Sequence, residues 1–266
     1  MSLNLFHHYN HQAPFGIISS IKQLKVPKQQ DMSTHQTAKT QFLKRPNGER
    51  FAFRRLGATW GIPLLMLIHY RGTMDFWDPL VVNSLAEHRP VVLMDYSGVG
   101  FSTGRVASTV ADSADDVLSF LELLGEKEVD ILGFSIGGYI APMVALNAPE
   151  DITVRKLVIA GTGPSAGPDT VINSPSHQDR VNNLAGGLDL TLDDFATLFF
   201  PQDLRGGAAL NSWFSRIHER NVSTSGEERS NWLSYNFTDG GKGVNAQTNL
   251  AASWLLVNET RGRNGS

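Results

Sequence analysis

The sequence contains no cysteine, and this absence removes several kinds of chemistry. Without a thiol the chain can form no disulfide, no thiolate nucleophile and no cysteine-ligated zinc or iron–sulfur site. The sequence also lacks an H-E-x-x-H motif and a close cluster of histidine with aspartate. We therefore expect a protein that uses neither a metal nor another cofactor.

A strong charge of one sign and a long apolar run are also missing. The formal net charge is only −3 at pH 7, so no basic surface indicates a nucleic-acid partner. No apolar run reaches the roughly 20 residues that span a bilayer, and residues 15–21 are interrupted by glycine and serine, unlike a signal peptide. We expect a cytoplasmic protein without a membrane span, and the sequence leaves its oligomeric state open.

The first part of the chain has little that could form a core. Residues 1–30 hold no acidic side chain and few apolar clusters, and Met32 offers an alternative start site. We predict a disordered extension over residues 1–38.

Residues 39–164 alternate between short apolar runs and helical patterns. The runs that predict strands cover 40–44, 50–55, 63–69, 90–94, 129–134 and 156–160, and the helical patterns cover 78–87, 109–124 and 136–146. Alternation of this rhythm is typical of βαβ units and predicts an α/β fold with a mostly parallel sheet and flanking helices.

The pattern changes after residue 164. A stretch rich in glycine, proline, serine and asparagine is followed by helical patterns at 192–200, 208–219 and 246–257, with no further buried strand. We predict a helical segment over 165–257 and a flexible tail over 258–266.

The strongest local signal is Gly133-Phe134-Ser135-Ile136-Gly137, which matches G-x-S-x-G directly after a predicted strand and at the start of a predicted helix. A sharp strand-to-helix turn lifts the hydroxyl of such a serine above the sheet edge. The N–H groups at the start of the helix then face a developing oxyanion. This context makes Ser135 the candidate nucleophile.

Two further motifs follow strands in the same order as in a known family. His69-Tyr70-Arg71-Gly72 follows the third strand, and Asp95-Tyr96-Ser97-Gly98-Val99-Gly100-Phe101-Ser102 follows the fourth. Together with the serine motif, they resemble the motifs of the α/β-hydrolase superfamily. Within it they are similar to those of the haloperoxidase-like, esterase and lactonase members. The resemblance runs from about residue 41 to 164, and more loosely through a helical lid to 257.

The resemblance implies an oxyanion hole made by two backbone N–H groups. One belongs to Ile136, directly after the nucleophile, and the other to the turn after the third strand. Arg71 matches the donor position of that turn, with Tyr70 as the second candidate. Tyr70 stands where the family usually has glycine.

The family's chain order places an acid and then a histidine after the serine. Only His177 and His218 follow Ser135, and no further strand pair is predicted to carry the usual acid and base. His218 is therefore the remaining candidate for the base, and Asp169 or Asp151, near the end of the sixth predicted strand, for the acid. We expect a fold that lacks the last strands, and a catalytically incomplete hydrolase fragment or pseudoenzyme is the alternative to an active enzyme.

Aromatic residues are concentrated in the predicted lid. They are Phe195, Phe199, Phe200, Trp213, Phe214, Trp232, Tyr235 and Trp254. Such residues either pack the lid onto the body or line an apolar pocket. The second interpretation predicts a small apolar substrate such as an ester or lactone, although haloperoxidase-like or carbon–carbon bond hydrolysis on the same scaffold stays open.

Overall fold

The computed structural model describes residues 33–165 and 191–255. Within the predicted N-terminal extension, residues 33–38 form a turn in which His35 and Ala38 are buried. Residues 1–32, 166–190 and 256–266, which include the rest of that extension and the predicted tail, lie outside the described residues.

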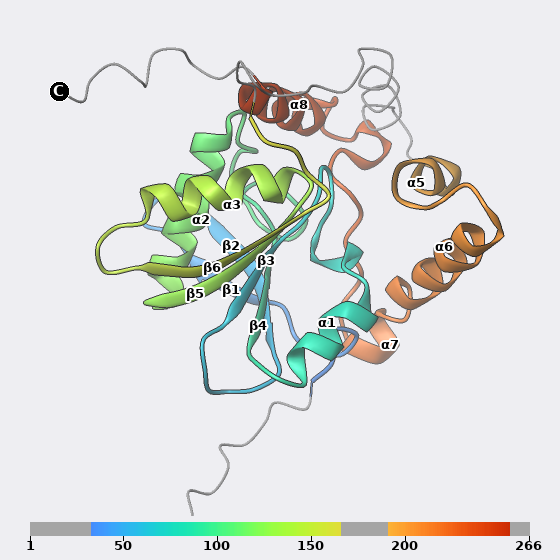
Figure 1. The fold of residues 1–266 in the computed structure, drawn as a ribbon, viewed down its shortest axis with the longest axis horizontal. Helices are drawn as coiled ribbons and strands as arrows, with labels where there is room; N and C mark the ends of the chain where they lie inside the picture. Colours follow the sequence, from blue (N-terminus) through green and yellow to red (C-terminus); the bar gives the residue numbers. More distant parts are fainter. Residues whose placement is uncertain (1–32, 166–190, 256–266) are drawn as a thin grey trace, which may run out of the picture.

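The centre of the molecule is a six-stranded sheet in the order β1-β2-β4-β3-β5-β6 (Figure 1). The strands are β1 Gln41–Lys44, β2 Arg50–Leu56, β3 Leu64–Leu67, β4 Val91–Met94, β5 Glu128–Phe134 and β6 Thr153–Ala160. Strand β2 pairs antiparallel with β1 and β4, whereas the pairs β4–β3, β3–β5 and β5–β6 are parallel. This confirms the predicted α/β fold with a mostly parallel sheet.

Helices cover both faces of the sheet. Helix α2, Val110–Leu124, packs beside α3, Ile136–Asn147, and α1, Pro79–Ala86, lies on the opposite face (Figure 1). The ends of α2 are where the sequence places them. The hydroxyl of Thr109 accepts the N–H of Asp112, and Gly125 ends the helix at a φ of 78°.

The core follows from the continuous apolar runs. Every residue of β3 and β4 is buried, as expected for strands covered on both faces. Phe120 of α2 meets Phe51 and Phe53 of β2 edge to face, each at a centroid distance of 5.7 Å. Strand β6 is different, because it forms one of the two edges of the sheet and has Leu157, Val158 and Ile159 exposed.

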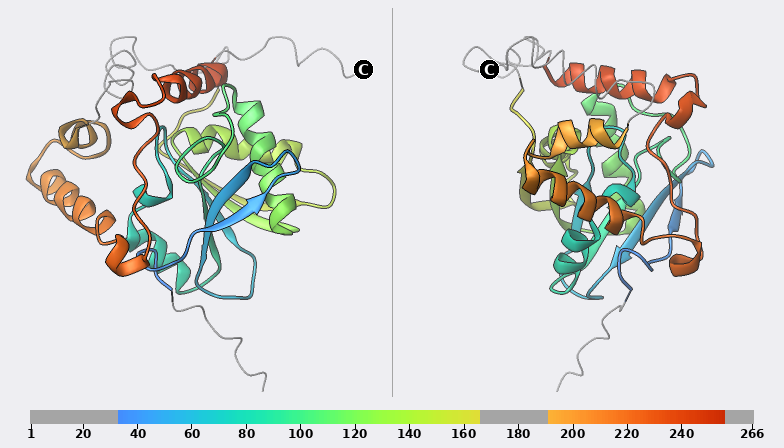
Figure 2. Two further views of the ribbon diagram at one scale, coloured as in Figure 1. Left: turned by 180° about the vertical axis from the view of Figure 1, so that it is seen from behind. Right: turned by 90° about the vertical axis from the view of Figure 1, so that its right-hand side faces the viewer.

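Beyond β6, residues 191–255 are mainly helical, and we call them the cap. Its helices are α5 Leu192–Phe199, α6 Leu204–Ile217, α7 Val222–Ser225 and α8 Lys242–Leu255, and short 3-10 turns lie at η1 Met74–Phe76 and η2 Tyr235–Phe237. Helices α5 and α6 project beside the sheet, while α8 lies across the α2–α3 side (Figure 2). None of the helices in the described parts of the chain is long and apolar enough to cross a membrane.

Two cap helices begin four residues earlier than predicted. Helix α6 starts at Leu204 because the carboxylate of Asp203 accepts the N–H of Gly206 and caps the first turn. The two glycines that follow weaken the helical pattern in the sequence. Helix α8 starts at Lys242, after two glycines at positive φ that turn the chain.

Candidate active site

Ser135 lies at the junction of β5 and α3 in a strained backbone conformation. Its φ is 57° and its ψ is −119°, a region that non-glycine residues rarely adopt. Its N–H donates to the carbonyl of Ala160 at 3.0 Å, which ties the junction to the end of β6. The residue is half-buried.

Glycine is required at two positions of this junction because backbone lies where a side chain would be. A Cβ on Gly133 would lie 2.2 Å from the carbonyl oxygen of Gly137. A Cβ on Gly137 would lie 2.2 Å from the carbonyl oxygen of Leu67 in β3. The helix therefore approaches the sheet more closely than any side chain would allow. Ile136 is its first residue, and the N–H groups that begin a helix have no carbonyl partner one turn earlier in that helix.

The turn after β3 lies next to this junction. The ring of His69 is buried against Phe134, at a centroid distance of 5.7 Å, and its Nδ1 lies 2.9 Å from the carbonyl of Tyr70. Burial lowers the pKa of His69 to about 4, so the ring is neutral at pH 7. His69 therefore shapes the turn through packing and one local hydrogen bond.

Arg71 is the residue around which this turn is built. Its φ is 61° and its side chain is fully buried. Its Nε donates to the carbonyl of Leu233 at 2.9 Å, and the N–H of Leu233 donates back to the carbonyl of Arg71 at 2.9 Å. Its own N–H donates to Oε1 of Gln247, on α8, at 2.7 Å.

Tyr70 is also held by α8. Its hydroxyl lies 2.8 Å from the hydroxyl of Thr248 and donates to the carbonyl of Val244 at 3.3 Å. Sequence reasoning found Tyr70 and Arg71 but missed Gln247, Leu233 and Thr248. These partners lie more than 160 residues along the chain, and no local pattern marks them.

His218, the predicted base, contacts Phe214 and Arg229 and not Ser135. It caps the C-terminus of α6, is exposed, and places Nδ1 2.7 Å from the carbonyl of Phe214. Its Nε2 lies 3.4 Å from Nη1 of Arg229. Within residues 33–165 and 191–255 the structure shows no hydrogen bond between a histidine and Ser135. Asp169, the predicted acid, lies outside the described residues, and Asp151 is exposed and paired with Lys127.

Asp95 organises the loop after β4. Its two carboxylate oxygens accept the N–H of Met74, at 2.8 Å, and the N–H of Phe101, at 2.9 Å. Burial raises the pKa of Asp95 to about 7, although both N–H groups favour the charged form. A Cβ on Gly100 would lie 2.3 Å from this carboxylate, which explains the glycine in the motif.

Aromatic rings connect the sheet edge to the cap. Phe76 of η1 stacks on Phe195 of α5 at 5.9 Å, and Phe199 lies 5.0 Å from His69 and 6.0 Å from Phe134. Trp232 lies 5.9 Å from Phe195. Three of the predicted lid aromatics, Phe195, Phe199 and Trp232, therefore form one cluster with Phe76, and through Phe199 this cluster contacts Phe134, the residue before Ser135.

A buried charge network joins the cap to the core. The carboxylate of Asp75 accepts Nη1 of Arg54 at 2.6 Å and the N–H and hydroxyl of Ser230 at 2.8 and 2.7 Å. Arg220 lies 3.3 Å from the same carboxylate and pairs with Glu227 at 2.6 Å. Burial alone would raise the pKa of Asp75, but Arg54 and Ser230 outweigh it and lower the pKa to about 2.

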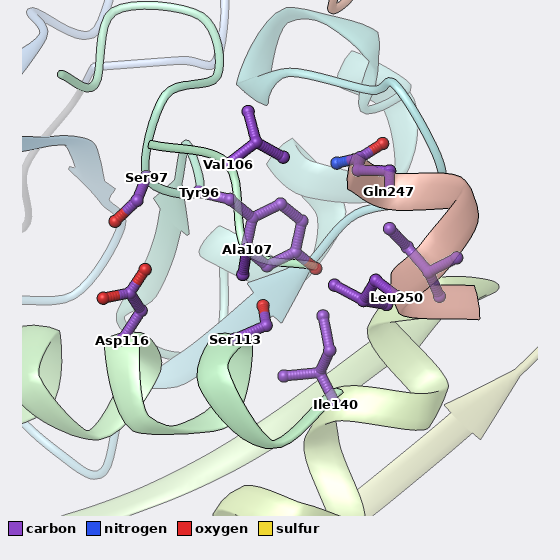
Figure 3. Close-up of a pocket in the computed structure, with 10 residues that line it drawn as sticks. Tyr96, Ser97, Val106, Ala107, Ser113, Asp116, Ile140, Gln247 and Leu250 are labelled. Atoms are coloured by element: carbon purple, nitrogen blue, oxygen red, sulfur yellow. The ribbon is translucent and has the colours of Figure 1, made fainter. Parts of the chain in front are cut away.

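A small cavity lies behind the junction, between α2, α3 and α8. Its volume is about 10 Å³, and its lining includes Tyr96, Ser113, Ile140, Gln247 and Leu250 (Figure 3). This volume holds about one water molecule, so the cavity is not a substrate pocket. Among the described residues no group of three histidine or acidic side chains is placed to hold a metal ion.

A family model described as the alpha/beta hydrolase fold matches residues 63–216, which is more than half of the chain. The chain belongs to the α/β-hydrolase family. An alpha/beta hydrolase fold protein from Chitinophaga pinensis is 30% identical, superposes with a TM-score of 0.70, and covers 84% of this chain and 74% of that one. The esterase EaEST from Exiguobacterium antarcticum, at 20% identity and a TM-score of 0.55, over 79% of this chain and 72% of its own, shares the fold.

Curated relatives match over shorter stretches. The RutD protein of Serratia proteamaculans (strain 568), named as a carbamate hydrolase, is 31% identical over 134 residues, which are 50% of this chain and 48% of that protein. The mitochondrial palmitoyl-protein thioesterase ABHD10 of Rattus norvegicus is 31% identical over 115 residues, 42% of this chain and 38% of its own. The chain thus spans about half or less of the length of the curated relatives it matches.

Proposed function

We propose that this α/β-hydrolase chain is a serine hydrolase of small apolar esters, lactones or related carbonyl compounds, with Ser135 as nucleophile. The observation that carries the proposal is the conformation of Ser135. Ser135, between a parallel strand and a helix and flanked by two glycines that pack on backbone, has a φ of 57° that non-glycine residues rarely adopt. Strain of this kind is stored where a reactive group must be presented.

In the proposed reaction, the Oγ of Ser135 attacks the carbonyl carbon of the substrate and the carbonyl oxygen becomes an oxyanion. The N–H of Ile136 and one N–H of the 69–72 turn stabilise that oxyanion, with Arg71 as the first candidate and Tyr70 as the second. The bond between the carbonyl carbon and the alcohol oxygen then breaks, and this oxygen receives the proton that the serine gave up; in a lactone the new hydroxyl stays on the acyl chain. Water then hydrolyses the acyl-enzyme, which releases the acid and restores the Ser135 hydroxyl.

The Ser135 proton must pass to a base, since a neutral serine hydroxyl is a poor nucleophile. Within the described residues His218 is the candidate base that the sequence offers, and Asp169, outside them, is the candidate acid. His218 can serve only if the cap moves its ring away from Phe214 and Arg229, because both ring nitrogens are engaged there. This arrangement favours a second candidate function, a hydrolase-fold protein that binds an apolar ligand without turnover.

The substrate class follows from what surrounds the nucleophile. Aromatic side chains from η1, α5 and the 230–235 segment favour an apolar acyl or alcohol group. The relatives named as a carbamate hydrolase and a thioesterase act on carbonyl compounds that a serine nucleophile also attacks. We therefore extend the proposed substrates to esters, thioesters and carbamates with small apolar groups.

The direct test is turnover of a short aryl ester such as 4-nitrophenyl butyrate by the purified chain. We expect Ser135→Ala to lower the rate by about a thousandfold or more, because the nucleophile is removed. Ser212→Ala is the matched control, since Ser212 is exposed on α6, and it should leave the rate unchanged. Binding of the ester without Ser135-dependent turnover would favour the non-catalytic function.

A further inference from the structure

The N–H of Arg71 is expected to help bind the oxyanion, yet it already has an acceptor. It donates to Oε1 of Gln247 at 2.7 Å, and Gln247 is only 1% exposed while Arg71 is fully buried. One N–H carries one hydrogen and makes one strong, nearly linear hydrogen bond. A substrate carbonyl therefore cannot take this donor while Gln247 holds it.

The Oε1 oxygen of Gln247 is chemically similar to the substrate carbonyl oxygen with which it would compete. An amide carbonyl oxygen accepts a hydrogen bond from a backbone N–H in the same way as the carbonyl oxygen of an ester. It is weaker than an oxyanion, because charged acceptors form stronger hydrogen bonds. Gln247 can thus block a neutral substrate carbonyl and still be displaced when charge develops.

Gln247 has little room to withdraw on its own. The cavity beside it measures about 10 Å³, which is enough for one water molecule but not for a carboxamide group (Figure 3). Helix α8 also holds the turn through Thr248 and Val244, which both contact the hydroxyl of Tyr70. Withdrawal of Gln247 therefore requires a displacement of α8.

We propose that Gln247 is a built-in competitor for the oxyanion hole, and that movement of α8 opens the site by freeing the N–H of Arg71. The proposal rests on the proposed serine-hydrolase function. It assigns to α8 the regulation of that site, because the same helix packs on α2 and α3 and carries the blocking side chain.

The alternative is that Gln247 merely positions the turn by holding Arg71 at its φ of 61°. The two roles predict opposite effects of shortening the side chain. Loss of a competitor speeds the reaction of Ser135, whereas loss of a positioning contact slows it.

The experiment measures the rate constant for labelling of Ser135 by a fluorophosphonate probe, whose P=O oxygen occupies the oxyanion hole. Gln247→Ala and Gln247→Asn remove the contact, the second by shortening the side chain by one methylene, and we expect labelling to become about tenfold faster. Gln247→Glu provides a charged, stronger acceptor, and we expect labelling to become about tenfold slower. Asn249→Ala, exposed on the same helix, is the control and should match the original chain.

Thermal unfolding of each variant checks that the fold is kept, and Gln247→Asn serves if Gln247→Ala does not fold. The proposal would also be supported if Ser135 is labelled in Gln247→Ala or Gln247→Asn and acquires no label in the original chain. Labelled Ser135 with slower or unchanged rates in the Ala and Asn variants would overturn it and leave the proposed function intact. Absence of an adduct in every protein would overturn both.

Discussion

The close packing of the serine junction on β3 requires glycine at position 137. Its missing side chain leaves room for the carbonyl of Leu67, which would lie 2.2 Å from an added Cβ. Both partners belong to the buried backbone of the core, so neither can move without disturbing β3 or α3.

We predict that Gly137→Ala lowers the free energy of unfolding by about 2 kcal/mol or more, since overpacking of this size costs roughly 1–3 kcal/mol. Gly207→Ala is the matched control, because an added Cβ on this α6 glycine meets nothing within 4 Å. It should raise stability by about 0.5–1 kcal/mol. Urea denaturation measures both, and equal effects of the two variants would refute the packing argument.

Asp95 makes the free energy of unfolding fall as the pH rises from about 4 to about 7. An unfolded aspartate titrates near 4, whereas burial raises the pKa of Asp95 to about 7 in the folded chain. Between these values the folded chain keeps a proton that the unfolded chain has lost. The stability from protonated Asp95 is therefore fully present below about pH 4 and is lost as the pH rises to about 7.

We predict that Asp95→Asn removes this decline, because asparagine stays neutral at every pH. Compared with the variant, the original chain should lose up to roughly 4 kcal/mol of unfolding free energy between pH 4 and pH 7. Urea denaturation at several pH values gives the two profiles. Parallel profiles would show that Asp95 is ionised in the folded chain throughout this range.

At the scale of elements, the cap is attached to the core by a desolvated ion network. Arg220, between α6 and α7, has a side chain that is 3% exposed, faces Asp75 and donates to the carbonyl of Ala38 at 2.8 Å. It thus joins the cap, the core and the segment before β1. A buried ion network of this kind is strongly destabilised when one partner is removed.

We predict that Arg220→Met costs about 3–5 kcal/mol of unfolding free energy, because Glu227 and Asp75 then lose a buried partner. Arg205→Met is the control, since its side chain is 95% exposed and its pair with Asp203 should contribute less than about 1 kcal/mol. Urea denaturation compares the two variants. A similarly small loss of unfolding free energy in both variants would mean that the ion network does not stabilise the packing of the cap on the core.

The elements that sequence patterns predicted well are those with local causes. The apolar run at residues 63–69 contains the buried strand β3, and the Thr109 and Gly125 caps fix both ends of α2. The Ser135 junction was equally visible, because a strand, a glycine-flanked serine and a helix are contiguous. Helix α7 and the early start of α6 were missed, since a short helix and a cap before two glycines leave only a weak pattern.

The parts of the site that were not predictable depend on contacts between distant segments. No periodicity connects Gln247 with Arg71, or Arg220 with Asp75, because these pairs arise only when the cap folds onto the sheet. The roles of Asp169 as acid and His218 as base stay predictions. Asp169 lies outside the described residues and His218 contacts other groups.

At the scale of the whole molecule, β6 is the element most open to other chains. It forms the sheet edge within the described residues, and Val158 and Ile159 are each 50% exposed. An unprotected apolar edge strand is a site of self-association.

We predict that Val158→Lys reduces concentration-dependent light scattering of the purified chain, because a charged side chain on an edge strand opposes strand pairing between molecules. Glu150→Lys, an exposed change of larger charge outside the strand, controls for net charge. Equal reduction by both variants would assign the effect to charge and not to the edge.

The central claim is that Ser135 is an activated nucleophile. The most direct measurement is incubation of the purified chain with a fluorophosphonate probe, followed by mass spectrometry of its peptides. We expect one adduct, on Ser135, that is absent from Ser135→Ala and present in Ser212→Ala. A folded chain that acquires no adduct, or acquires it on other serines at equal rates, would contradict the account and leave an α/β-hydrolase fold without an activated serine.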